Sequence, residues 1–130
     1  MKTYKFDINP LAKPRMTRGD KANYRPVTQR YFAYANELKL QANIQGLHDL
    51  PGSIDRLVFY IQMPKSWSEK KKEHMDKKPH QQTPDLTNLC KAFEDIICKE
   101  DSHIYEYRSG LCKFWARQGQ IHLFVNAEPA

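Results

Sequence analysis

From Pro84 to Ile97 the chain reads PDLTNLCKAFEDII. At roughly 100° per residue, the apolar side chains of this segment fall within an arc of about 140°, which is the pattern of a helix with one buried face. The apolar positions are Leu86, Leu89, Ala92, Phe93, Ile96 and Ile97. Thr83 can cap such a helix and Pro84 suits its first position, so we expect the helix to run from Pro84 to about Cys98.

The rest of the chain predicts strands on both sides of this helix. The expected strands are residues 4–8, 56–63, 103–115 and 120–125, the last two joined by a turn near Gly119. Two further helices are expected at 28–45, capped by Thr28 and buried through Phe32, Ala35, Leu38 and Ala42, and at 67–77. Residues 78–83 are expected to form an extended linker, in which His80 would be solvated, and Trp67 and Trp115 to cover an edge of the core.

This order of elements predicts an α/β or α+β fold with a mixed β-sheet packed by helices. The 130 residues, 15.3 kDa, suit a single domain spanning residues 1–130. A hydrophobic fraction of 40% is too high for a disordered chain.

Several classes of protein are not expected. The longest apolar runs, such as residues 58–61, are far shorter than the roughly 20 residues of a membrane span, and the N-terminus has no apolar signal region. Cys90, Cys98 and Cys112 form no CxxC pair, which argues against a disulfide framework and a four-ligand zinc site and favours a cytoplasmic protein. The histidines make no HExxH motif, and no glycine-rich loop indicates a nucleotide cofactor.

The positive charge lies in the first half of the chain. Residues 1–65 carry 11 basic and 5 acidic side chains, a net charge of +6, whereas residues 66–130 carry 10 of each. Six cations precede or begin the first expected helix, opposed only by Asp20: Lys13, Arg15, Arg18, Lys21, Arg25 and Arg30. With Tyr24, Tyr31 and Phe32 among them, they suit contact with a DNA backbone, although a solvated basic surface has the same composition.

A polar edge runs along the quoted helix. Asn88, Lys91 and Asp95 fall within about 60° of one another, and Asp85 lies about 60° from Asn88. Asp101 follows the helix, and a strand or loop that returns past the helix could set Asp101 beside Asp85. Convergent carboxylates with a lysine match a Mg²⁺-dependent phosphodiesterase, in which oxygen ligands hold the ion and an ammonium stabilises developing charge. The structural alternatives are a helix cap at Asp85, a surface ion pair of Lys91 with Asp95, and a turn at Asp101.

Residues 78–105 resemble the signature of the RusA family of Holliday-junction resolvases, approximately P-D-x-D-N-L-x-K-x-x-x-D followed by an acidic D-D-x-x-[IV]. The matching positions are Pro84, Asp85, Asn88, Leu89, Lys91 and Asp95, then Glu100 to Ile104. Residues 13–18, KPRMTR, resemble the Pro/Arg-rich N-terminal stretch of that family.

The resemblance implies a small homodimeric nuclease, often phage-encoded, that cuts four-way DNA junctions with Mg²⁺ and leaves 5′-phosphates; Mn²⁺ is a possible substitute. It implies that Asp85 and Asp101 are catalytic, metal-binding carboxylates and that Lys91 is the catalytic lysine. Asp95 matches a further acidic position that we include in the metal set, and Asn88 a supporting amide.

Thr87 stands where the family pattern has its second acid. On an ideal helix it lies roughly 200° from Asp85. One fewer carboxylate weakens the attraction for a divalent cation. Two alternatives therefore stay open: a junction-binding protein with a weakened or inactive site, and a basic nucleic-acid-binding accessory protein whose acids are structural.

Overall fold

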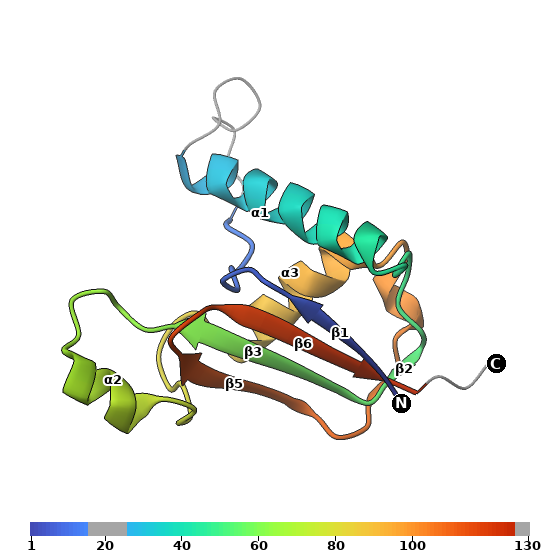
Figure 1. Ribbon diagram of the computed structural model, residues 1–130. Coiled ribbons are helices and arrows are strands. Elements are labelled where there is room, and N and C mark those ends of the chain that lie inside the picture. Colours follow the sequence, from blue (N-terminus) through green and yellow to red (C-terminus); the bar gives the residue numbers. More distant parts are fainter. Residues whose placement is uncertain (16–25, 127–130) are drawn as a thin grey trace.

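The computed structural model describes residues 1–15 and 26–126. Its centre is strand β3 (Arg56–Gln62), in which Leu57, Phe59 and Ile61 alternate toward the core. Three strands join it in a sheet of order β1-β6-β3-β5 (Figure 1). These strands are β1 (Lys2–Phe6), β5 (Leu111–Ala116) and β6 (Gln120–Val125). β6 pairs antiparallel with β1 and β3, whereas β5 pairs parallel with β3, so the sheet is mixed.

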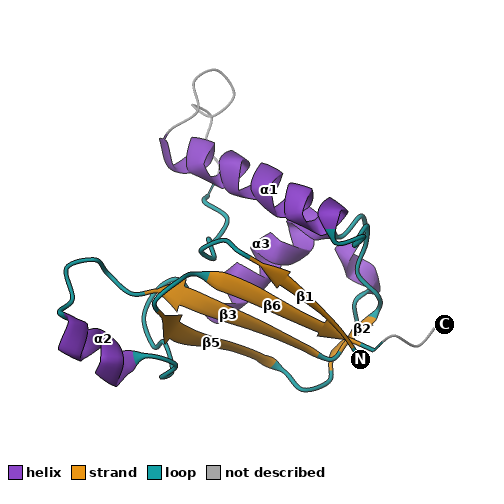
Figure 2. Cartoon of the chain, in the orientation of Figure 1, coloured by secondary structure: helices purple, strands orange, loops and turns teal. Residues whose placement is uncertain are grey.

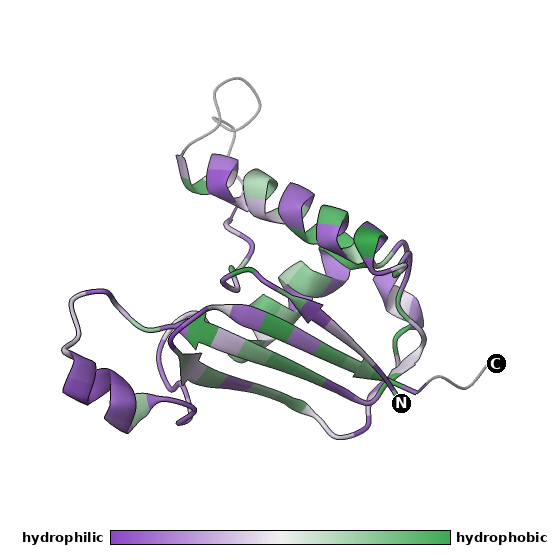
Figure 3. Cartoon of the chain, viewed as in Figure 1, coloured by the Kyte–Doolittle hydropathy of each residue, from purple (hydrophilic) through white to green (hydrophobic). Residues whose placement is uncertain are grey.

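Two helices pack against the same face of the sheet, α1 (Pro26–Ile44) and α3 (Leu86–Ile97) (Figure 2). The helix α3 buries the apolar face that its sequence predicts, and the Phe93 ring meets the Phe6 ring edge-on with centroids 5.6 Å apart. The short helix α2 (Glu69–Met75), capped by Ser68, has no buried residue and is almost wholly hydrophilic (Figure 3). The result is the small α+β fold that the element order predicts.

The free edge of β1 is closed by two side chains, Gln41 in the last turns of α1 and Gln45 just after the helix. The Gln45 amide accepts from the Lys5 N–H at 3.0 Å and donates to the Lys5 carbonyl at 2.9 Å. Gln41 makes the same pair of bonds to Asp7, at 2.7 and 3.1 Å. These bonds satisfy backbone groups that an edge strand otherwise leaves open. The strand ends at Phe6, where its pairing with β6 stops, rather than at residue 8 as expected.

The start and the buried face of the first helix differ from the expectation. The helix α1 begins at Pro26, because proline is tolerated in a first turn, and Thr28 is fully buried rather than a cap. Phe32 is 38% exposed, because the buried face passes through Tyr31 and Tyr34 instead. The amphipathic rings of these tyrosines carry the packing that the sequence pattern assigned to phenylalanine.

The predicted start of α3 is wrong by two residues. Asp85, not Thr83, is the N-cap, and the helix begins at Leu86. The preceding segment is held in extended form against β5, where the His80 N–H donates to the Lys113 carbonyl at 3.1 Å and Pro79 bridges Phe114. This pairing delays the first helical turn.

The single strand expected at 103–115 is also wrong. A 3₁₀ turn (Asp101–His103) is followed by β4 (Glu106–Tyr107), a turn, and only then β5. β4 pairs in parallel with β2 (Ser53–Ile54), a strand that was not predicted. Gly110, with φ 87°, turns the chain between β4 and β5 because this backbone conformation favours glycine.

His80 is buried rather than solvated. It is 4% exposed, and its ring packs on the Trp115 indole with centroids 4.2 Å apart. Trp115 also contacts Trp67 at 4.7 Å, so the two tryptophans cover an edge of the core as expected. Burial lowers the pKa of His80, which is therefore neutral at pH 7. Among the helices of the described residues, none combines the length and the hydropathy that a bilayer span requires.

Candidate functional site

The N-terminal end of the polar edge of α3 carries a carboxylate that the helix does not use. Asp85 is the N-cap residue and is exposed, and its side chain makes no capping hydrogen bond. Lys113 of β5 fixes the backbone just before it, because its ammonium donates to the Pro84 carbonyl at 2.6 Å and to that of Gln82. The Asp85 carboxylate therefore lies at a helix N-terminus whose backbone is held in place by Lys113, and it is available to a ligand.

Farther along the same edge, one ammonium joins two carboxylates. The Nζ atom of Lys91 lies 3.1 Å from Oδ1 of Asp95 and donates a hydrogen bond to Oδ2 of Asp101. The Nζ atom of Lys13 lies 3.6 Å from Oδ2, the other carboxylate oxygen of Asp95. Two cations and two anions therefore meet where α3, the 3₁₀ turn and the N-terminal segment come together.

The charges in this cluster reinforce one another. The hydrogen bond to Asp101 and then that to Asp95 raise the pKa of Lys91, and the Lys91 ammonium lowers the pKa of Asp101. Both side chains remain ionised at neutral pH. The Asp95 and Asp101 side chains are 23% and 32% exposed, so the cluster is open to solvent and to a phosphate group.

The predicted carboxylates do not surround one point. Asp85 and Asp95 are ten residues apart, which separates them by about 15 Å along the helix axis. Two oxygens bound directly to the same Mg²⁺, at about 2.1 Å each, lie at most roughly 4 Å apart. Asp95 and Asp101 are brought together through Lys91, whereas Asp85 lies toward the other end of the edge.

The supporting residues stay near Asp85. Thr87 and Asn88 are both exposed in the first turns of α3. Both side chains offer oxygen atoms to solvent, and neither is buried in the core.

The basic residues predicted to contact DNA are only partly described. Lys13 reaches the cluster through Asp95, Arg15 is exposed two residues later, and Arg30 is exposed in α1. Arg18, Lys21 and Arg25 lie outside the described residues. The N-terminal basic segment therefore comes within ion-pair distance of the polar edge at Lys13.

The sequence did not predict a half-buried polar network that joins α3 to β4. The Tyr107 hydroxyl donates to Glu94 at 2.6 Å, and the Cys90 thiol lies 3.3 Å from that hydroxyl. Burial raises the pKa of Cys90 to about 12, so this thiol is inert, as expected for a cysteine without a basic activator. The spacing of Cys90 and Glu94 on one helix face was a possible signal, but nothing in the sequence indicated Tyr107 or Lys113.

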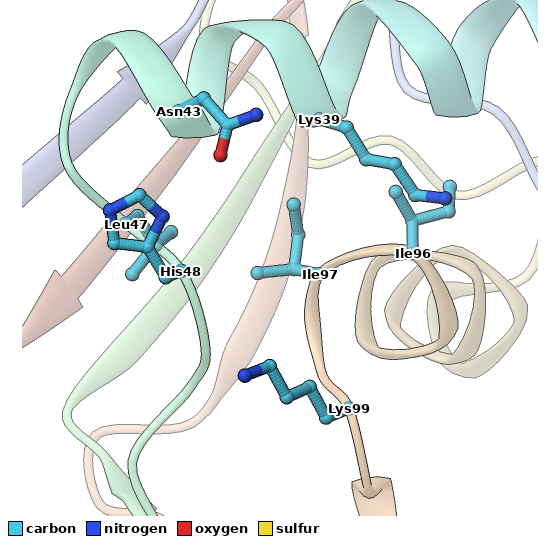
Figure 4. A pocket seen from close by; sticks show the side chains of 7 residues that line it. All are labelled: Lys39, Asn43, Leu47, His48, Ile96, Ile97 and Lys99. Atoms are coloured by element: carbon cyan, nitrogen blue, oxygen red, sulfur yellow. The ribbon is translucent and has the colours of Figure 1, made fainter.

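A separate hollow of about 430 Å³ lies between the C-terminal ends of α1 and α3 (Figure 4). Its lining is apolar at the base and basic at the rim: Lys39, Asn43, Leu47, His48, Ile96, Ile97 and Lys99. It contains none of the predicted site residues and no carboxylate, so it is not a candidate for the magnesium site.

A comparison with protein families gives one match. Residues 7–126 match the family described as Endodeoxyribonuclease RusA. No curated protein matches the chain. The match covers almost the whole chain and includes both the polar edge of α3 and the N-terminal basic segment.

Proposed function

Because the chain belongs to the RusA family of endodeoxyribonucleases, we propose that it resolves four-way DNA junctions by Mg²⁺-dependent hydrolysis at the polar edge of α3. The observation that carries this proposal is the position of the Lys91 ammonium, which bonds both Asp95 and Asp101. A site that collects two carboxylates around one cation, beside a basic segment, suits phosphate chemistry.

The donor set fits magnesium. The candidate ligands offer only carboxylate, hydroxyl and amide oxygens, which are the hard donors that Mg²⁺ prefers. Asp101 and Asp95 would bind the ion directly. Magnesium keeps several of its waters. Asp85, about 15 Å from Asp95 along the helix axis, is too far to reach the hydration shell of such an ion and would contribute only the field of its negative charge. When bound, the ion polarises the phosphoryl group and favours attack by water.

The role of Lys91 follows from its two partners. When a divalent cation neutralises the carboxylates, the Lys91 ammonium is free to donate to a phosphoryl oxygen of the DNA. There it stabilises the negative charge that develops as the bond from phosphorus to the 3′-oxygen breaks. Water supplies the new oxygen, so the products are a 5′-phosphate and a 3′-hydroxyl.

The basic segment would hold the DNA arms. Lys13, Arg15 and Arg30, together with Arg18, Lys21 and Arg25, supply up to six contacts to phosphates. The contact of Lys13 with Asp95 supports a path of DNA that passes directly over the polar edge.

We further propose that the protein acts as a homodimer on DNA in the cytoplasm of a bacterium, encoded by the cell or by a phage. A four-way junction has near two-fold symmetry, and resolution requires two incisions. An isologous dimer presents one copy of the polar edge to each of the two cleaved strands.

The decisive experiment is cleavage of a synthetic four-way junction with end-labelled strands, in Mg²⁺, Mn²⁺ or EDTA, with linear duplex as the control. We expect paired nicks with 5′-phosphate ends on the junction, little cutting of the duplex, and none in EDTA. Junction binding without cleavage at every Mg²⁺ and Mn²⁺ concentration would contradict the proposal. It would instead favour the junction-binding alternative that Thr87 raises.

A further inference from the structure

A second group of metal-ligating side chains lies just beyond the C-terminal end of α3. Asp49, Cys98 and His103 each place one donor atom within 4.8 Å of the other two. The Sγ atom of Cys98 lies 3.8 Å from Nδ1 of His103. A tetrahedral zinc ion, with bonds of about 2.3 Å to sulfur and about 2.1 Å to nitrogen, separates two such atoms by about 3.6 Å. The donor spacing is therefore already close to that of a bound site.

The ligand side chains are oriented by neighbouring backbone groups. The Nε2 atom of His103 lies 2.6 Å from the Leu50 carbonyl, a contact that in metal sites orients the imidazole so that its other nitrogen can bind the ion. In this structure that other nitrogen, Nδ1, contacts the Glu100 carbonyl. Oδ1 of Asp49 accepts from the Leu50 and Lys99 N–H groups, at 2.8 and 3.2 Å. In zinc sites, hydrogen bonds from neighbouring backbone groups hold the ligand side chains in place in the same way.

We propose that Asp49, Cys98 and His103 bind one zinc ion, with a solvent molecule in the fourth position. Sulfur and imidazole donors favour zinc over magnesium, so this site differs in chemistry from the one on the polar edge. On binding, the Cys98 thiol would lose its proton to solvent. His103 would lose the Nδ1 proton that faces the Glu100 carbonyl, and the metal would take the place of that contact. Sequence spacing did not reveal the site, because Asp49 is 49 residues from Cys98.

The zinc ion would join three pieces of chain. Cys98 is the C-cap of α3, His103 ends the 3₁₀ turn that begins with Asp101, and Asp49 belongs to the loop after α1. Binding would fix the turn that carries Asp101. The inference concerns metal binding and thermal stability, so it does not depend on whether the protein cleaves junctions.

Cobalt(II) is the probe for this site, because it takes the place of zinc and is coloured. Titration of the full chain with Co²⁺ should produce a thiolate-to-cobalt charge-transfer band and intense visible bands that saturate at one ion per chain. Zn²⁺ should abolish these bands, and a large excess of Mg²⁺ should not. Zn²⁺ should also raise the Tm, since it binds the folded chain in preference to the unfolded one.

Variants separate this site from other sites. Cys98→Ser should remove the charge-transfer band, and His103→Gln should weaken Co²⁺ binding at least tenfold. Cys112→Ser and Asp85→Asn should leave both band and stoichiometry unchanged, with circular dichroism confirming that each variant is folded. Absence of the band in the wild type, or its persistence in Cys98→Ser, would overturn the proposal, as would a Zn²⁺ effect on Tm that is equal in the wild type and His103→Gln.

Discussion

The Lys91 ammonium donates a hydrogen bond to the Asp101 carboxylate, which ties the middle of α3 to the turn that follows the helix. The same ammonium pairs with Asp95 one helical turn farther along. Neither partner alone distinguishes a surface ion pair from a site, because i,i+4 pairs are common on helices. The second carboxylate, from outside the helix, makes the arrangement one in which anionic oxygens converge on a single cation.

Replacing Asp101 tests whether this convergence serves catalysis. Asp101→Asn keeps the shape of the side chain but removes its charge, so we expect junction cleavage to fall by about 100-fold or more while junction binding persists or tightens. Single-turnover cleavage at saturating protein and gel-shift titration measure the two effects. Glu69→Gln removes a carboxylate of α2 that pairs with Arg117; this variant is the control and should cleave normally. Normal cleavage by Asp101→Asn would exclude this carboxylate from the site.

The ion pair also predicts how Asp101 titrates. Lys91 lowers the pKa of Asp101, so the stabilisation that the pair provides is present above about pH 3.9 and is lost as the pH falls through the lowered folded value. The pKa of Lys91 is raised, so its charge persists through the neutral range. In Lys91→Met, the Asp101 pKa should rise toward its ordinary value, as read from the side-chain carboxyl carbon by NMR. An Asp101 pKa that is the same in both proteins would mean that the ion pair does not form in solution.

The sequence predicted correctly those elements whose residues repeat with a helical or strand period within one segment. The apolar face of α3, the strand β6 and the polar edge with Lys91 and Asp95 all follow from periodicity within one segment. Helix boundaries and burial that depend on contacts between distant segments were not predicted. Asp85 caps α3 because β5 holds the preceding residues, and His80 is buried because Trp115 lies beneath it.

The site was predictable to a similar extent. The spacing on one helix placed Lys91 beside Asp95, and the resemblance to a family pointed to Asp101. The angles around a helix placed Asp85 and Asp95 on one edge but say nothing of the distance along the axis, which is about 15 Å. The sequence pattern therefore could not show that these two carboxylates are too far apart to bind one ion. The contacts of Lys113 and Tyr107 with residues of this region depend on how the strands pair, and the pattern within α3 does not predict that pairing.

The described part of the basic segment can be tested through salt dependence. Changing Lys13, Arg15 and Arg30 together to Ala should weaken binding to all DNA shapes and flatten the slope of log K against log salt by up to about three units. Changing Lys65, Lys70 and Lys72, in and before α2, is the charge-matched control and should change the slope less. Equal slopes in the wild type and the Lys13/Arg15/Arg30 variant would mean that these residues face away from DNA.

Gly119 should be required by a close backbone contact. A Cβ at this position would lie 2.4 Å from the Cα of Asn9, whose side chain also accepts from the Gln62 N–H. We expect Gly119→Ala to lower the free energy of unfolding by about 1–3 kcal/mol, the range for overpacking a site that can shift only in part. Urea denaturation measures this, with the neighbouring Gln118→Ala as the control. A Gly119→Ala protein as stable as the control would show that residues 9 and 119 do not pack in this way.

Thr87 provides the sharpest test of how the site holds its metal. It is exposed in the first turn of α3, at the position where the family pattern carries an acid. Thr87→Asp adds negative charge near Asp85, where the helix N-terminus favours a carboxylate, so the variant should remain folded. We expect the wild type to cleave with a relatively high Mg²⁺ requirement, because few charged ligands attract the ion, and Thr87→Asp to lower the Mg²⁺ concentration for half-maximal cleavage several-fold. Thr87→Asn, of similar size but uncharged, is the control and should leave that concentration near the wild-type value.

If the wild type does not cleave and Thr87→Asp does, the added acid restores a weakened site. If Thr87→Asp changes neither the metal requirement nor the rate, position 87 faces away from the metal, and Asp95 and Asp101 must hold the ion without it.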